Sequence, residues 1–145
     1  LGGRVDGIDT GAALDDATVA WIRDALIDRK VLVFPGQKLD AAGFHQFARR
    51  LGSLQQHVLR KYRHDDFPEL SWLTNVAKDG SVDEFGVIRA TSWHTDGSYT
   101  QDPPMLGILY ALEVPSRGGA TIFADKPFEV GDTMRTTPKR TIPER

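Results

Sequence analysis

The chain has 145 residues, of which 40% are hydrophobic and 26% are charged, and its formal net charge is −2. One globular domain fits this length, and the near-neutral charge provides no field that would attract nucleic acid or an anionic membrane. The absence of cysteine excludes a disulfide framework and fits a cytoplasmic protein, so a transition-metal site must use carboxylates and the four histidines.

The first thirty residues are predicted to form a strand, a loop and a helix. Residues 1–14 are expected to contain an initial strand, and they lack the basic and apolar regions of a signal peptide. Asp15 or Asp16 is expected to cap a helix that runs to about Lys30, because apolar residues recur there at helical spacing. No apolar run in the chain approaches the ~20 residues that a membrane helix needs.

A buried strand and a second helix are predicted to follow. Residues 31–34 are all apolar and precede Pro35-Gly36, a pattern typical of a buried strand and a turn. Asp40 is expected to cap the second helix, and Gly52 is expected to follow its last turn. The buried stripe of this helix is predicted to consist of Phe44, Phe47, Ala48 and Leu51.

Beyond the second helix the pattern favours strands and irregular segments. Residues 53–69 are expected to form a loop with a short strand, and residues 70–76 a strand. The segment 83–103 is predicted to be irregular. Residues 105–114 form a long apolar run that predicts a central strand, which a Pro- and Gly-rich turn separates from the next strand at 120–124.

The segment from Trp93 to Tyr99 contains the triplet His94-Thr95-Asp96. Residues two apart on an extended chain project from one face, so an imidazole nitrogen and a carboxylate oxygen can meet one divalent ion. One further His would complete the two-His-one-carboxylate triad of non-haem iron(II) oxygenases, which leaves positions open for a 2-oxo acid and dioxygen. A His beside an Asp is more often a surface pair, so the triplet alone does not establish a metal site.

The residues around this triplet make the pattern specific. The strings WHTDGSY, PP and LYALEVPSRGGATIFAD, together with VLVFPGQ and FARRLGSL, resemble the signatures of the taurine and chlorophenoxyacetate dioxygenase family. The resemblance extends over nearly the whole chain up to Asp125. It implies that His94 and Asp96 are catalytic and bind iron. It also implies that Thr121 contacts 2-oxoglutarate and that His57 lies at the acidic group of the substrate.

The same resemblance implies a mainly β fold with flanking helices, the distorted jelly-roll or double-stranded β-helix, incomplete in this chain. The implied enzyme is an Fe(II)- and 2-oxoglutarate-dependent dioxygenase. It uses dioxygen to hydroxylate a small anionic substrate, such as a sulfonate, a sulfate or an aryloxy acid, and it releases succinate. Residues 1–125 are expected to be the N-terminal part of this domain, and a homo-oligomer is compatible with the family.

The sequence departs from the family after Asp125. The family's second iron-binding His and the Arg that pairs with the distal carboxylate of 2-oxoglutarate are missing from their usual context, and no His follows His94. Residues 126–145 are expected to be an irregular tail that resembles joined remnants of a longer C-terminal part. Within this tail, Arg135 matches the 2-oxoglutarate-binding Arg better than Arg140 does.

Two interpretations therefore remain open. The chain either belongs to an active dioxygenase whose remaining part lies outside this sequence, or is a catalytically incomplete jelly-roll fragment that acts only as a binding or structural module. If the chain is complete, His57 is the best substitute for the third iron ligand, and His45 and His64 are poorer ones. Formation of succinate from 2-oxoglutarate separates these interpretations.

Overall fold

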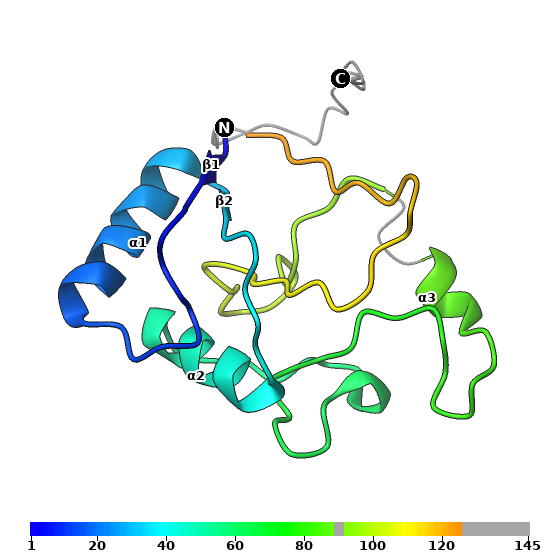
Figure 1. Cartoon of the computed structure of the whole chain (residues 1–145). Coiled ribbons are helices and arrows are strands. Elements are labelled where there is room, and N and C mark those ends of the chain that lie inside the picture. Colours follow the sequence, from blue (N-terminus) through cyan, green and yellow to red (C-terminus); the bar gives the residue numbers. More distant parts are fainter. Residues whose placement is uncertain (89–91, 126–145) are drawn as a thin grey trace.

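The computed structural model describes residues 1–88 and 92–125. In chain order, the elements of this part are β1 (Gly3–Arg4), α1 (Asp16–Arg29), β2 (Leu32–Val33), α2 (Ala41–Leu51), the 3-10 helix η1 (Arg60–Tyr62) and α3 (Glu84–Ile88). In the view of Figure 1, α1 and α2 lie on one side of the molecule and α3 on the other, with residues 92–125 running between them. None of the described helices is long and apolar enough to span a membrane.

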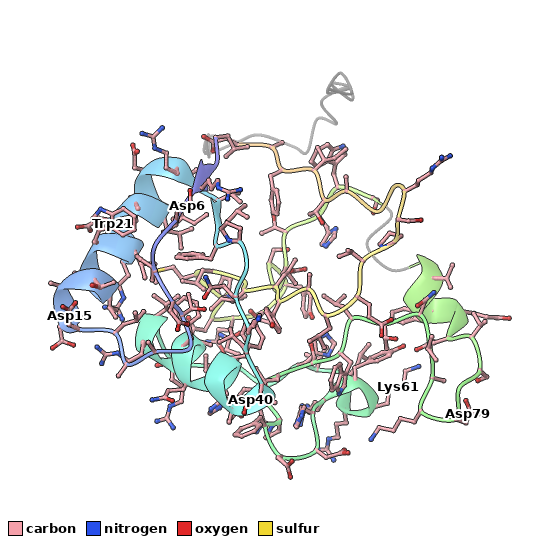
Figure 2. The ribbon with its side chains drawn as sticks, in the orientation of Figure 1. Asp6, Asp15, Trp21, Asp40, Lys61 and Asp79 are labelled. Carbon is pink, nitrogen blue, oxygen red and sulfur yellow. The ribbon has the colours of Figure 1, made fainter. Side chains whose placement is uncertain are left out.

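Asp15 determines where α1 begins (Figure 2). Its side chain accepts a hydrogen bond of 2.7 Å from the backbone N–H of Thr18, as an N-cap residue does, and this bond lowers the pKa of Asp15. At the other end, Lys30 has a φ of 66°, and its N–H donates to the carbonyl of Leu26 over 2.7 Å. The predicted helix is therefore confirmed, with Asp15 as its cap and a lysine in a left-handed position that usually holds glycine.

β1 and β2 pair in parallel, with Gly3 opposite Leu32 and Arg4 opposite Val33. Two parallel strands need a crossover connection, which α1 supplies, so the first part of the chain forms a β-α-β unit. The initial strand and the strand within residues 31–34 are confirmed, although each has only two residues, and β2 is not buried as predicted, because Val33 is 56% exposed.

α2 packs against α1 and completes the core. Its cap is Asp40, whose side chain accepts a hydrogen bond of 2.7 Å from the N–H of Gly43. The helix ends at Leu51 and Gly52 follows it as predicted, but this glycine has a φ of 166° and is extended rather than left-handed. The core consists of the buried Val19, Ile22, Phe47 and Leu51, with Ile8, Leu14, Leu32, Phe34, Leu106 and Ile108 packed against them. Burial of each large apolar side chain contributes about 1.5–3 kcal/mol to stability.

The prediction of a central strand at residues 105–114 is wrong for the described part of the chain, because this segment is hydrogen-bonded to no neighbouring strand there. Burial of the side chains nevertheless alternates as in a strand from residue 104 to residue 110, whereas residues 111–114 are all exposed. Leu106 and Ile108 pack against the core, whereas Met105 and Leu109 are 86% and 65% exposed. A strand needs an adjacent chain to satisfy its backbone groups, and no described segment occupies that position.

The other strands predicted in the second half of the chain are also not formed as predicted in the described residues. Only two isolated antiparallel bridges occur near residues 70–76, namely Arg63 with Ser71 and Val76 with Val82. Residues 120–124 form no strand, residues 53–69 contain η1 instead of a short strand, and α3 lies where an irregular segment was predicted. These few strands agree with an incomplete fold, and the jelly-roll itself stays a prediction.

Candidate functional site

His94 and Asp96 lie side by side in the exposed loop that follows α3. The Nε2 atom of His94 is 3.3 Å from the Oδ1 atom of Asp96, and the two side chains are 48% and 82% exposed. This distance suits an ion pair when His94 is protonated. It also suits a shared metal, because two adjacent ligands with bonds of about 2.1 Å to one octahedral ion lie roughly 3 Å apart. The structure thus brings together the two groups that the sequence pattern singles out.

The second ring nitrogen of His94 determines the tautomer of the neutral imidazole. Nδ1 lies 2.8 Å from the carbonyl oxygen of Ser92, which can only accept a hydrogen bond. Nδ1 therefore carries the proton, and Nε2 keeps its lone pair on the side of Asp96. A metal-binding histidine commonly donates its other N–H to a backbone carbonyl in this way, because the bond fixes the ring for coordination.

Gly97 sets the direction of the chain directly after Asp96. Its φ of 64° lies in the left-handed region, and a Cβ atom at this position would collide with the ring of Pro104. The carbonyl of Gly97 accepts hydrogen bonds from the N–H and the Oγ1 of Thr100, at 2.9 and 2.7 Å, which close a tight turn. Glycine is therefore required here on conformational and steric grounds.

No third ligand accompanies this pair in the described part of the chain. Among residues 1–88 and 92–125, no group of three or more His, Cys, Asp or Glu residues could hold a metal ion. His45 instead lies 3.4 Å from Glu69, and the ring of His64 stacks on Trp72 with 5.7 Å between centroids. The histidines weighed as substitutes for the third ligand are thus not brought to the His94–Asp96 pair.

Thr121 lies on an exposed segment after the turn at Gly118-Gly119. These two glycines have φ values of 75° and 71°, and a Cβ atom on Gly119 would lie 2.7 Å from the ring of Pro115. The chain bends at residues 116–117, but among the described residues no backbone hydrogen bond closes the predicted tight turn. Thr121 forms no hydrogen bond with the other described residues. Its contact with 2-oxoglutarate stays a prediction, and Arg135 lies outside the described residues.

His57 is half-buried in the loop before η1. Its Nδ1 atom accepts a hydrogen bond of 3.1 Å from the N–H of Leu59, and its backbone carbonyl accepts one of 2.6 Å from the Nε of Arg63. Its ring meets that of Tyr62 edge-on, with 6.5 Å between centroids and 87° between planes. His57 is thus well held, and its contact with the substrate stays a prediction.

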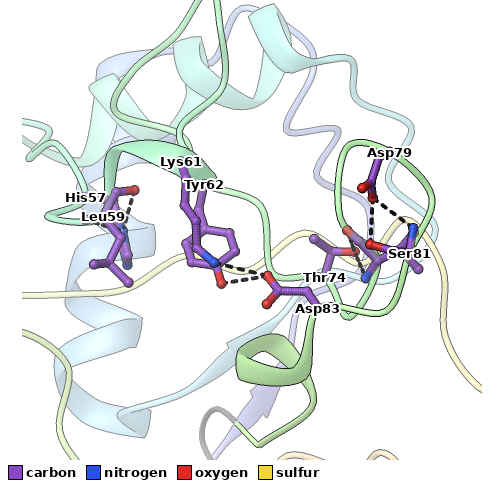
Figure 3. A network of polar contacts seen from close by, with 9 residues as sticks. His57, Leu59, Lys61, Tyr62, Thr74, Asp79, Ser81 and Asp83 are labelled. Carbon is purple, nitrogen blue, oxygen red and sulfur yellow. Dashed lines mark hydrogen bonds and ion pairs between the residues drawn. The ribbon is translucent and has the colours of Figure 1, made fainter.

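A polar network that the sequence analysis missed joins η1 to the start of α3 (Figure 3). The hydroxyl of Tyr62 donates to Oδ2 of Asp83 over 2.6 Å, and the Nζ of Lys61 lies 3.7 Å from the same oxygen. The Tyr62 hydrogen bond, then a backbone hydrogen bond from Gly86, and then the positive charge of Lys61 hold the pKa of Asp83 below its ordinary value. No sequence pattern signals this contact, because 21 residues separate its two partners.

The family model described as "Taurine catabolism dioxygenase TauD, TfdA family" matches residues 2–139. An alkylsulfatase of Acinetobacter baylyi is 34% identical over 131 residues, which are 86% of this chain and 37% of that protein. An alpha-ketoglutarate-dependent 2,4-dichlorophenoxyacetate dioxygenase of Burkholderia sp. is 32% identical over 132 residues, or 85% of this chain and 44% of that protein. A pentalenolactone F synthase of Streptomyces avermitilis is 35% identical over 129 residues, and the match covers 86% of this chain and 42% of that protein.

The chain spans about two fifths of the length of these curated relatives. No solved structure matches it. The family match includes the positions of His57, His94, Asp96 and Thr121, on which the resemblance in the sequence was based. The chain belongs to the taurine catabolism dioxygenase TauD, TfdA family.

Proposed function

We propose that the whole protein is an Fe(II)- and 2-oxoglutarate-dependent dioxygenase that hydroxylates a small anionic substrate and converts 2-oxoglutarate to succinate. The observation that carries this proposal is the convergence of His94 Nε2 and Asp96 Oδ1, 3.3 Å apart, in a chain of this family. Several of the relatives are named for alkyl sulfates, sulfate esters, 2,4-dichlorophenoxyacetate and phenoxypropionate. Each of these compounds carries a sulfate or a carboxylate, which supports an anionic substrate.

The chemistry of the donor pair fits iron(II). An imidazole nitrogen and a carboxylate oxygen are two of the three groups in the facial triad, and the carbonyl of Ser92 keeps the imidazole in the tautomer that can coordinate. Bound iron(II) supplies the activation of dioxygen that attack on an unreactive C–H bond requires. His94 and Asp96 hold the ion, and the Gly97 turn fixes the direction of the second ligand. The remaining His is proposed to lie in the part of the family's length that this chain does not span.

The other predicted site residues have binding roles in this proposal. Thr121 donates its hydroxyl to a carboxylate of 2-oxoglutarate, and Arg135 pairs with the distal carboxylate, for which the planar guanidinium is well suited. His57 donates to the acidic group of the primary substrate. The half-buried position of His57 and its fixed ring support this role, since a binding group gains affinity when it is ordered in advance.

The fold is proposed to be a mainly β jelly-roll, with residues 1–125 as its N-terminal part and the tail 126–145 carrying pieces of its C-terminal part. The strand-like alternation at residues 104–110 supports this, because one face of that stretch packs on the core and the other is exposed. The cysteine-free composition supports a cytoplasmic location.

Succinate formation tests the function. The full-length protein, supplied with iron(II), ascorbate, 2-oxoglutarate and air, is expected to form succinate, and an alkyl sulfate or an aryloxy acid is expected to increase the rate. His94→Ala and Asp96→Ala are expected to abolish succinate formation, whereas Asp24→Ala, which removes an exposed carboxylate on α1, leaves it unchanged. If the unmodified protein forms no succinate, the alternative of a binding or structural module takes the place of the enzyme.

A further inference from the structure

The two ring nitrogens of His57 have different surroundings. Nδ1 lies 3.1 Å from the backbone nitrogen of Leu59 and 3.4 Å from the carbonyl oxygen of the same residue. The shorter contact is the stronger hydrogen bond, and an N–H can only donate, so Nδ1 must accept. In the neutral ring the proton therefore lies on Nε2. Among the described residues, Nε2 of His57 has no hydrogen-bond partner.

Arg63 holds the backbone that carries this ring. Its Nε donates to the carbonyl of His57 over 2.6 Å, and its Nη1 donates to Oε1 of Gln56 over 2.9 Å. One guanidinium thus ties two successive residues of the loop, and the planar shape of this group fixes their relative direction. Arg63 is itself anchored, because its backbone forms a bridge with Ser71 and its N–H donates to the carbonyl of Arg60.

The ring of Tyr62 lies next to the imidazole of His57 and restricts its movement. Tyr62 is 4% exposed, its ring meets His57 edge-on, and its hydroxyl is tied to Asp83 (Figure 3). The ring of His57 is therefore restrained by the backbone of Leu59, by the guanidinium of Arg63 through the loop, and by a fixed aromatic neighbour. A restrained imidazole with an unused N–H is suited to donate one directed hydrogen bond to an anionic oxygen.

We propose that Arg63 is a positioning residue that keeps His57 in its Nε2–H tautomer, so that His57 serves as a neutral hydrogen-bond donor to the anionic group of the substrate. This inference rests on the proposed function for the identity of the ligand, but the tautomer and its dependence on Arg63 are properties of the protein without ligand. Arg63 acts through the loop that carries His57 and does not touch the substrate.

Nuclear magnetic resonance of ¹⁵N-labelled histidine in the full-length protein reads the tautomer directly. The signals of His57 are assigned by their loss in His57→Gln, and the spectra are recorded at alkaline pH. The expected result is a single Nε2–H form in the unmodified protein and a mixture of both tautomers in Arg63→Met. Arg49→Met, which removes an exposed guanidinium on α2, is expected to leave the Nε2–H form unchanged. An Nδ1–H form in the unmodified protein, or an unchanged spectrum in Arg63→Met, would overturn the proposal.

Steady-state kinetics with hexyl sulfate as the probe test the consequence for binding. Arg63→Met is expected to raise KM about tenfold with little change in kcat, because one directed hydrogen bond is weakened and the reacting centre is not. Arg63→Lys is expected to recover only part of the loss, since one ammonium cannot reproduce the two fixed bonds. A fall in kcat at unchanged KM contradicts a positioning role. If the unmodified protein forms no succinate, the proposed function fails, while the tautomer measurement still decides the role of Arg63.

Discussion

The Nε2 atom of His94 faces the Oδ1 atom of Asp96 at 3.3 Å, and the carbonyl of Ser92 fixes the same imidazole through Nδ1. Both constraints are local. The first needs only the two-residue spacing, and the second needs a carbonyl two residues before the histidine. A pair that is already assembled loses little conformational entropy when an ion binds. The local backbone therefore holds these two side chains at a spacing that suits one shared metal ion.

If His94 and Asp96 bind the metal, a substitution of His94 is expected to weaken metal binding. His94→Ala is expected to lower the affinity for Co(II), a spectroscopic substitute for iron(II), by at least about tenfold, because one of the ligands is lost. His57→Ala is expected to leave the affinity unchanged, since the proposed role of His57 is to bind the substrate. The absorption of bound Co(II) during a titration of the full-length protein measures both values. A strong loss of affinity in His57→Ala would instead favour this residue as the third ligand.

The turn after Asp96 predicts an asymmetry between two glycines with positive φ. Gly80, with a φ of 86°, has open space where a Cβ would be added, whereas a Cβ on Gly97 would collide with Pro104. Gly80→Ala is expected to cost about 1 kcal/mol for conformation alone. Gly97→Ala is expected to cost about 1–3 kcal/mol more for the overlap, and also to weaken Co(II) binding.

Urea unfolding and the Co(II) titration measure these effects on the same preparations. Equal losses of unfolding free energy in Gly80→Ala and Gly97→Ala would show that the ring of Pro104 moves away from the added Cβ without an energetic penalty. A normal Co(II) affinity in Gly97→Ala would show that the direction of the chain after Asp96 does not matter for the metal.

The Tyr62–Asp83 contact predicts a pH dependence of stability. The pKa of Asp83 is lowered in the folded state from its ordinary value of 3.8, chiefly by the Tyr62 hydroxyl. A lowered folded pKa gives stability that is present above pH 3.8 and is lost as the pH falls through the folded pKa. Tyr62→Phe is therefore expected to lower the urea midpoint at pH 7, and to lower it by a smaller amount at pH 3.

The matched control for this experiment is Tyr99→Phe, because Tyr99 is 76% exposed. That variant is expected to leave the urea midpoint unchanged at both pH values. An equal destabilisation by Tyr62→Phe at pH 7 and pH 3 would show that the hydroxyl contributes through contacts other than the ionised carboxylate of Asp83.

The end of α1 predicts a stabilising substitution. Lys30 has a φ of 66°, a conformation that costs a residue with a side chain about 1–2 kcal/mol and glycine almost nothing. Lys30→Gly loses the hydrogen bond from Nζ to the carbonyl of Ile27, so a net gain of about 0.5–1 kcal/mol is expected. Lys30→Ala keeps the strain and is expected to give no gain. Thermal unfolding of the three proteins distinguishes these outcomes.

Local signals in the sequence predicted the first half of the fold well. Asp15 and Asp40 cap their helices through short hydrogen bonds from backbone N–H groups three positions ahead. Such a cap can be recognised in a sequence, because both partners lie within one helical turn. The same holds for His94 and Asp96, because their spacing alone brings the side chains together on an extended chain. These features depend on neighbours within a few residues.

Features that depend on distant partners could not be predicted in this way. The run at residues 105–114 has the composition of a strand, and burial alternates in it up to residue 110, but a strand exists only beside another strand. The contact of Tyr62 with Asp83 likewise spans two loops and leaves no periodic trace. α3 is a short helix whose five residues include glycine and valine, so intrinsic preference did not indicate it.

The outward row of the segment 105–114 has a practical consequence for work with this protein. Met105 and Leu109 present apolar side chains to the solvent beside backbone groups that no described neighbour engages. Unpaired backbone edges next to exposed apolar side chains promote aggregation, because they can form β-sheet contacts between molecules. Residues 1–125 handled by themselves in a crystallisation drop are expected to aggregate along this row. Replacement of Leu109 by lysine is the smallest change that interrupts the row without disturbing the packed side.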